Sequence, residues 1–163
     1  MSSKSAFTTT KTRGTAAAPA SRRVPPASRL FEELVEGEPV VGISAVHAIR
    51  AGFSADMLKS ASRFFDVPEK TLYQITHIAP STAHRLLQKR ARIDPAASER
   101  IVRMSDFTRM AQEVFEDRES ALAWLKRPNG ALGGAAPLEL ADTEPGAMAV
   151  RQILNAIATG GAL

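Results

Sequence analysis

The stretch that decides the fold runs from Asn129 to Gly160 and reads NGALGGAAPLELADTEPGAMAVRQILNAIATG. One glycine pair, Gly133-Gly134, lies within it, and a second, Gly160-Gly161, lies at its end. Glycine readily adopts the left-handed backbone angles that end a helix, so each pair predicts a helix stop. The stretch therefore holds at least two short helical segments and their boundaries.

Two helix starts lie between these stops. Pro137 suits the first turn of one helix, because the backbone amides of that turn make no hydrogen bond within the helix. Thr143, followed by Glu144 and Pro145, predicts a second helix with the threonine as its N-cap. Beyond it the apolar residues recur at spacings of three and four: Ala147, Val150, Ile153, Leu154 and Ile157. Such a short amphipathic helix must dock its apolar stripe on the rest of the protein.

The order and spacing of these residues resemble the toxin-binding domain of the Xre/MbcA/ParS antitoxins. The chain departs from the usual pattern at Ala135 and Ala136, where polar residues are common, and near Ala156 and Ala158, where charged ones are. The resemblance covers roughly Phe53 to Leu163. The residues that carry it are Leu132, Gly133, Gly134, Pro137, Leu138, Glu139, Leu140, Asp142, Thr143, Gly146, Val150, Leu154, Ile157 and Gly160.

In that family the module follows a helix-turn-helix DNA-binding domain and blocks a RES-domain toxin that consumes NAD. The resemblance therefore implies a protein partner of that type. It also implies that the tail from Thr159 to Leu163, with Arg151 and Asn155 nearby, enters or covers the NAD cleft of the toxin. The expected toxin-binding residues are Trp124, Leu132, Gly133, Gly134, Pro137, Leu138, Arg151, Asn155, Thr159, Gly160, Gly161, Ala162 and Leu163.

Composition argues against an enzyme. The 163 residues are 44% hydrophobic and 23% charged, which is typical of a globular protein, and they include no cysteine. Disulfides, thiolate metal sites and cysteine nucleophiles are thereby excluded. The three histidines lack metal-site spacing, and no nucleophile has a base predicted beside it. We expect no catalytic residues, no metal and no cofactor.

The positive charge is concentrated in two segments. Residues 1–30 carry six basic and no acidic groups, and residues 80–104 carry six basic and two acidic groups, although the net charge is only +4. Clustering of this kind is the footprint of a polyanion-binding protein. Residues 1–27 contain almost no large apolar side chain, so we expect a disordered basic arm. That arm is either a solvated tail or a contact to DNA phosphate; its composition also resembles a transit peptide.

A helix-turn-helix is predicted between Ser54 and Arg90. Ser54 is a plausible N-cap for one helix, and Pro68 opens the next. The segment His77-Ile78-Ala79 turns the chain before Pro80 starts a third helix. Two features are unusual, because His77 stands where glycine is common and bulky Tyr73 where a small residue is common. The expected small core is Leu72, Ile78, Ala83 and Leu86.

The third of these helices has the side chains of a DNA-reading element. Arg85 can donate two hydrogen bonds to the edge of a guanine, and Lys89, Arg90 and Arg92 suit phosphates. The alternative is a small helical pair with a solvated basic face. The expected DNA-binding residues are Ser81, Thr82, His84, Arg85, Gln88, Lys89 and Arg90.

The remaining segments are also predicted to be helical. They are Ser28–Glu36, Val40–Ala51 (with a strand as alternative), Asp94 to about Phe115, and Asp117–Lys126. The long third segment is the expected spine of the core, or in part a dimer seam. The lone Trp124 is expected in the core or at an interface.

We therefore expect an all-α protein with a helix-turn-helix domain and a small helical toxin-binding module. The expected divisions are 1–27, 28–116 and 117–163. By the resemblance, it is a bacterial cytoplasmic antitoxin that blocks a RES toxin and represses its own operator, most simply as a dimer. The alternatives are a stand-alone helix-turn-helix repressor whose C-terminal module dimerises, and an adaptor with no DNA role. No apolar run is long enough to span a membrane.

Overall fold

The computed structural model describes residues 26–160, and within them the regular structure is entirely helical. Between Ser54 and Arg92 there is an isolated bridge, and none of the described residues forms a strand. The predicted all-α class is confirmed. The elements are η1 (Ala27–Arg29), α1 (Leu30–Glu36), α2 (Gly42–Ala51), α3 (Asp56–Phe65), α4 (Glu69–Thr76), α5 (Pro80–Gln88), α6 (Pro95–Phe115), α7 (Arg118–Lys126), η2 (Gly130–Leu132), η3 (Glu139–Asp142) and α8 (Glu144–Ala158).

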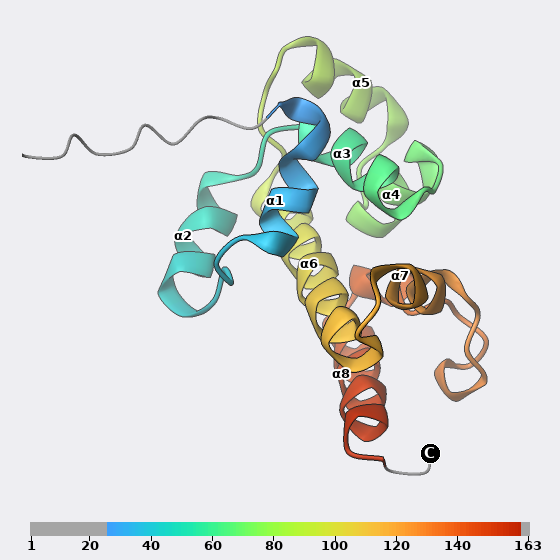
Figure 1. Cartoon of the computed structure of the whole chain (residues 1–163). Coiled ribbons are helices and arrows are strands. Elements are labelled where there is room, and N and C mark those ends of the chain that lie inside the picture. The colour runs from blue at the N-terminus through green and yellow to red at the C-terminus, as the bar shows by residue number, and fades with distance from the viewer. Residues whose placement is uncertain (1–25, 161–163) are drawn as a thin grey trace, which may run out of the picture.

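Helix α6 is the axis of the molecule, with α3, α4 and α5 near its beginning and α7 and α8 near its end (Figure 1). It starts because the Asp94 carboxylate accepts a 2.9 Å hydrogen bond from the amide of Ala97. Its inward stripe is fully buried at Ile101, Met104 and Phe107. The prediction that this stripe forms the spine of the core is confirmed.

The N-terminal helices pack against the same axis. Phe31 of α1 is completely buried, with its ring centroid 5.1 Å from those of Phe64 and Phe65. Arg109 of α6 donates hydrogen bonds to the carbonyls of Leu34 and Gly37. These carbonyls at the end of α1 have no acceptor role within the helix, so Arg109 supplies their hydrogen-bond donor. These contacts fix α1 across α3 and α6.

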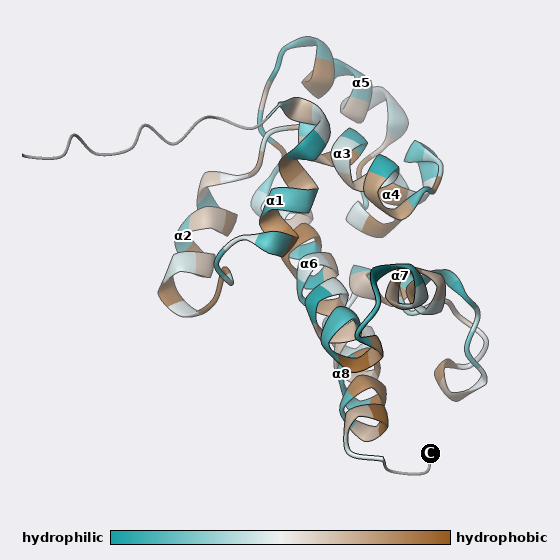
Figure 2. Ribbon diagram, viewed as in Figure 1, coloured by the Kyte–Doolittle hydropathy of each residue, from teal (hydrophilic) through white to brown (hydrophobic). Residues whose placement is uncertain are grey.

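Most of segment 40–51 forms helix α2, which begins at Gly42, so the prediction of a helix there is confirmed. No residue of α2 is buried, although the helix lies beside α6. Val41 is 62% exposed and Ile43 is 71% exposed. In Figure 2 most of the α2 ribbon is coloured white to brown, towards the hydrophobic end of the scale. Within the described part of the chain, no helix is long and apolar enough to cross a membrane.

Two predicted helix starts differ from the structure. Helix α3 begins at Asp56, one residue later than an N-cap at Ser54 predicts, and the amide of Ala55 donates a 2.9 Å hydrogen bond to the carbonyl of Ala91. The Ser54 hydroxyl still accepts the amide of Asp56 at 3.3 Å.

Pro137 does not open an α-helix. Only the short 3₁₀ turn η3 follows it, because the amide of Leu138 is tied to the carbonyl of Leu125 and a new N-cap, Thr143, comes soon after. Thr143 itself behaves as predicted: its hydroxyl accepts a 3.3 Å hydrogen bond from the amide of Gly146 and starts α8. Helix α8 then packs along α6 and buries four residues of its predicted stripe, namely Ala147, Val150, Ile153 and Leu154.

Candidate nucleic-acid interface and partner-binding module

Helices α4 and α5 form the predicted helix-turn-helix. Helix α4 ends at Thr76, and His77 adopts left-handed backbone angles with φ of 57°. Histidine accepts these angles at some cost in strain, so the turn has its usual geometry without the usual glycine. The expected small core is present: Leu72, Ile78 and Ala83 are buried, and Leu86 packs against them.

The bulky Tyr73 is accommodated at the edge of this core. Its side chain is half-buried, and its hydroxyl donates a 2.5 Å hydrogen bond to the Glu69 carboxylate one turn earlier on the same helix. Burial, followed by this hydrogen bond, raises the pKa of Tyr73 to about 12. The ring is thus engaged along α4 and does not prevent α5 from packing on it.

The outer face of α5 is exposed and carries no acidic side chain. Of the predicted DNA-binding residues, Thr82 alone is half-buried; the exposed ones are Ser81, His84, Arg85, Gln88, Lys89 and Arg90. The ring Nε2 of His84 lies 3.0 Å from Nε2 of Gln88, so these two polar groups are neighbours on the same face. A helix with this surface can enter a major groove with Arg85 free to reach a base edge.

The segment that follows α5 is anchored to the α2–α3 loop. The amide of Ile93 donates to the carbonyl of Phe53 at 2.9 Å, and Arg92 donates a 2.5 Å hydrogen bond to the carbonyl of Gly52. Gly52 has φ of 74°, and a Cβ there would lie 2.4 Å from the Ile93 carbonyl oxygen. Arg92, which the sequence suggested as a phosphate contact, therefore ties the segment after α5 to the loop before α3.

The second candidate site is the surface of α8 and the loop before η3. Exposed residues in this part of the expected toxin-binding set are Gly133, Gly134, Asn155, Thr159 and Gly160. Leu132 and Trp124 are half-buried, and the Trp124 ring centroid lies 5.7 Å from that of Phe115. The expected contacts Gly161, Ala162 and Leu163 lie outside the described residues.

Three other expected toxin contacts have internal roles. Pro137 and Leu138 are buried, Leu138 with only 2% of its surface exposed. The Arg151 guanidinium pairs with Glu144 at 3.0 Å and lies 3.9 Å from the Asp106 carboxylate. Burial raises the pKa of Asp106 above its ordinary value, although Arg151 and Arg109 oppose the shift. Pro137 and Leu138 are thus part of the packing of the module, whereas Arg151 holds two carboxylates with 31% of its side chain still exposed.

A groove that the sequence did not reveal lies between the last turns of α6 and α8. It encloses a volume of about 240 Å³. Apolar groups of Met110, Val114 and Ala158 share its lining with the polar groups of Glu113, Glu116 and Asn155. The sequence signal for this site is weak, because the two halves of the lining lie some forty positions apart. An exposed partner-binding face on α8 would therefore include a groove of mixed polarity that has two acidic residues in its lining.

Comparison with known proteins covers both sites. Residues 44–105 match the antitoxin Xre-like helix-turn-helix domain, and residues 110–160 match the antitoxin Xre/MbcA/ParS C-terminal toxin-binding domain. The two matched regions contain all of α3, α4 and α5 in the first case and α7, η3 and α8 in the second.

Similar whole proteins carry antitoxin names. The chain is 29% identical to "Antitoxin Xre" of Yersinia enterocolitica over 120 residues, 73% of this chain and 81% of the relative. It is 23% identical over 139 residues, 80% of this chain and 86% of the relative, to "Prs ADP-ribosylating antitoxin" of Sphingobium. It is 33% identical to "Antitoxin Xre" of Pseudomonas putida over 63 residues, 39% of this chain and 40% of the relative.

The helix-turn-helix with its exposed basic face, the separate module at the far end of α6, and the two domain matches lead to one assignment. The chain belongs to the Xre/MbcA/ParS-type antitoxins, with a helix-turn-helix DNA-binding domain and a C-terminal toxin-binding domain.

Proposed function

We propose that this protein neutralises a RES-type toxin that consumes NAD, and that it represses its own operon as a symmetric dimer. The observation that carries the proposal is the separation of two exposed surfaces along α6. The basic face of α5 lies near one end of this helix, and the groove beside Asn155 lies near the other. One chain could therefore hold DNA and toxin at the same time.

Two similarities support this class of toxin. The sequence pattern resembles antitoxins whose partners are RES domains, and the Sphingobium relative is named for ADP-ribosylation of Prs. ADP-ribosylation takes its ADP-ribose from NAD, so both similarities favour a partner that uses NAD. A cytoplasmic bacterial location agrees with both proposed ligands, because operon DNA and NAD meet there. The antitoxin acts by binding and has no catalytic step of its own.

We assign DNA contact to the outer face of α5, with Arg85 at a base edge and Lys89 and Arg90 at phosphates. Toxin contact is assigned to the exposed end of α8, at Asn155, Thr159 and Gly160, and to the adjoining groove. The functional division is placed at the end of α6, between residues 28–116 and 117–163. The expected arm, residues 1–27, lies almost entirely outside the described residues.

Co-expression with the product of the neighbouring gene tests the proposal. We expect a stable complex by size and mass, and its loss when the residues after Asn129 are deleted. Removal of residues 1–25 is the matched control and should leave the complex intact. The stand-alone repressor would instead give a lone oligomer that shifts the DNA upstream of its gene.

The role of the tail needs a separate measurement. Deleting residues 159–163 should leave toxin bound through the groove but restore its consumption of NAD. Full neutralisation by this shortened antitoxin would show that the tail does not cover the NAD cleft. Product analysis, free ADP-ribose against ADP-ribosylated protein, separates a RES hydrolase from a transferase.

A further inference from the structure

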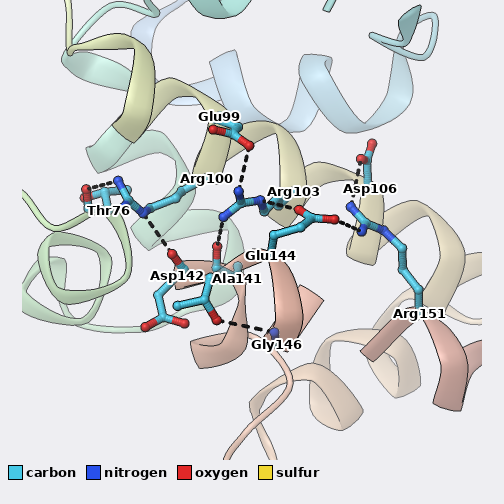
Figure 3. A network of polar contacts seen from close by, with 11 residues as sticks. Thr76, Glu99, Arg100, Arg103, Asp106, Ala141, Asp142, Glu144, Gly146 and Arg151 are labelled. Atoms are coloured by element: carbon cyan, nitrogen blue, oxygen red, sulfur yellow. Dashed lines mark hydrogen bonds and ion pairs between the residues drawn. The ribbon is translucent and has the colours of Figure 1, made fainter. Parts of the chain in front are cut away.

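Helix α6 and the start of α8 are joined by a network of polar contacts (Figure 3). The Nε of Arg100 donates a 3.0 Å hydrogen bond to the carbonyl of Asp142, and its Nη1 lies 3.4 Å from the carbonyl of Thr76. Three carboxylates of the network have guanidinium partners: Glu99 lies 2.6 Å from Arg103, Asp106 lies 3.9 Å from Arg151, and Glu144 lies 3.1 Å from Arg103 and 3.0 Å from Arg151. The acidic groups at this end of the helix pair are thus neutralised within the chain.

The other end of the same helix pair has acidic groups without such partners. Glu113 and Glu116 line the groove between the last turns of α6 and α8. Both side chains are exposed, and within residues 26–160 neither forms an ion pair or a hydrogen bond. The side-chain amide of Asn155, which lines the groove from α8, has no hydrogen-bond partner in this part of the chain either. The groove therefore presents free acceptor oxygens.

Glu116 stands at a position that suits another residue better. It follows the last residue of α6 and has φ of 53°, where glycine is the usual residue. Its carboxylate also lies at the negative end of the helix dipole, which favours basic side chains, and α6 has no basic residue in its last turn. Both features cost stability, and no contact of this carboxylate within the described residues offsets them. An external cation would give it a favourable partner.

The size and the walls of the groove restrict what can fill it. Its volume of about 240 Å³ is below the range of small-molecule sites, so it suits one long side chain. Apolar groups of Met110, Val114 and Ala158 form part of its lining. Arginine and lysine match this combination, because their aliphatic stems cover apolar surface while the charged head reaches a polar rim.

We infer that the groove between α6 and α8 holds one basic side chain of the toxin, with its stem along Met110 and Val114 and its charged head between Glu113, Glu116 and Asn155. The inference rests on the proposed function and names the chemistry of the toxin at that site. The head would exchange water for two carboxylates and an amide oxygen, and charge-assisted hydrogen bonds are among the stronger polar contacts. A basic side chain enclosed in this way is typical of the few residues that dominate the affinity of an interface.

Binding of the toxin from the neighbouring gene to full-length variants tests the inference. Glu113→Gln and Glu116→Gln keep the shape of each side chain and remove its charge. Each should weaken toxin binding by about tenfold or more, and operator binding should stay within about twofold of the natural value. Glu33→Gln is the matched control, because it removes an equally exposed carboxylate from α1 and should leave both affinities unchanged.

Charge reversal then identifies the occupant. Each exposed arginine and lysine of the toxin is replaced by glutamate, one at a time, and tested against the natural antitoxin and against Glu116→Lys. One toxin variant should lose binding to the natural chain and recover about tenfold or more of it with Glu116→Lys. The residue type at that toxin position distinguishes arginine from lysine.

The stability of the free antitoxin distinguishes binding from a structural role. Glu116→Gln and Glu116→Gly should unfold at the same denaturant concentration as the natural chain or at a higher one, because they relieve the charge or the backbone strain. A structural role for Glu116 would instead lower the midpoint in proportion to the loss of toxin binding.

The outcomes separate the inference from the proposed function. If the toxin does not bind the natural chain, the proposed function is wrong and the inference falls with it. If the toxin binds but tolerates both glutamine variants, or if no toxin variant is rescued by Glu116→Lys, the inference alone is overturned. A change in the oligomeric size of the free antitoxin with Glu116→Lys would also overturn it, because the groove would then hold a second copy of this chain.

Discussion

The hydroxyl of Tyr73 donates a 2.5 Å hydrogen bond to the carboxylate of Glu69, one turn away on α4. This pair lies on the first helix of the helix-turn-helix, where the sequence raised a doubt about the size of the side chain. Burial and the hydrogen bond together favour the protonated phenol, and they raise the pKa of Tyr73 to about 12.

Ultraviolet absorbance measures this ionisation directly, because Tyr73 is the only tyrosine in the chain. Glu69→Gln should lower the pKa of Tyr73, yet leave it above 10 because burial remains. Glu119→Gln on α7 is the control and should leave it unchanged. Since the folded state keeps its proton while the unfolded tyrosine loses it, stability should fall as pH rises from about 10 towards 12.

Substitutions on and after α5 should distinguish a residue that contacts a base from one that contacts a phosphate. Arg85→Ala should weaken operator binding by about 1–3 kcal/mol and reduce discrimination at one base pair. Lys89→Ala should weaken binding to all sequences alike and lower the salt dependence by about one unit of slope. Arg50→Ala removes an equal charge from α2 and should do neither. If Arg85→Ala binds the operator as tightly as the natural chain, α5 does not read the DNA in this way.

The junction of η3 and α8 should not tolerate a Cβ at Gly146. An added Cβ would lie 2.6 Å from the carbonyl oxygen of Leu140 and 3.0 Å from the Thr143 hydroxyl. Gly146→Ala should therefore destabilise the protein by about 1–3 kcal/mol in chemical denaturation. Gly130→Ala is the control: a Cβ there meets nothing within 4 Å, and stability should be unchanged or slightly higher. Equal stability of the two variants would contradict the close approach seen here.

Asp106 should make the protein less stable at neutral pH than at mildly acidic pH. Its raised pKa means that the folded state holds the proton more tightly than the unfolded state. Stability from this group is therefore gained as pH falls through the folded pKa and lost as pH rises. Relative to the natural chain, Asp106→Asn should gain stability against unfolding at neutral pH, and this difference between the two proteins should shrink on acidification. Thermal unfolding across pH, with exposed Glu113→Gln as control, measures the difference.

The helices of this protein could be predicted from local signals, and its connections could not. Asp94 and Thr143 cap their helices as their position before a proline predicts, because capping depends on only a few neighbouring residues. Pro137 gave a false helix start, since the hydrogen bond between Leu138 and Leu125 decides the backbone there. The sequence showed only that His77 stands where glycine is common, and the left-handed backbone angles of this residue were seen in the structure.

The candidate sites divide in the same way. The exposed face of α5 followed from helical spacing and charge alone. The internal roles of Leu138 and Arg151 did not, because they depend on which side of α8 and η3 meets α6. The contacts of Arg100 join residues 24 and 42 positions away in the chain, and no periodic pattern encodes such pairings. The basic face of α5 could be predicted from the sequence, whereas the groove beside α8 and the contacts of Arg100 were visible only in the structure.

Helix α6 also limits how such proteins can diversify. It runs without interruption for 21 residues from the DNA-binding half to the toxin-binding half. Each residue of an α-helix turns the chain by about 100° and advances it by about 1.5 Å. A single inserted residue would therefore swing the module to another side of the molecule and separate Arg100 from one of its two carbonyls. New toxin specificities can be recruited by exchanging everything after the middle of α6, but only between chains that keep its length in register.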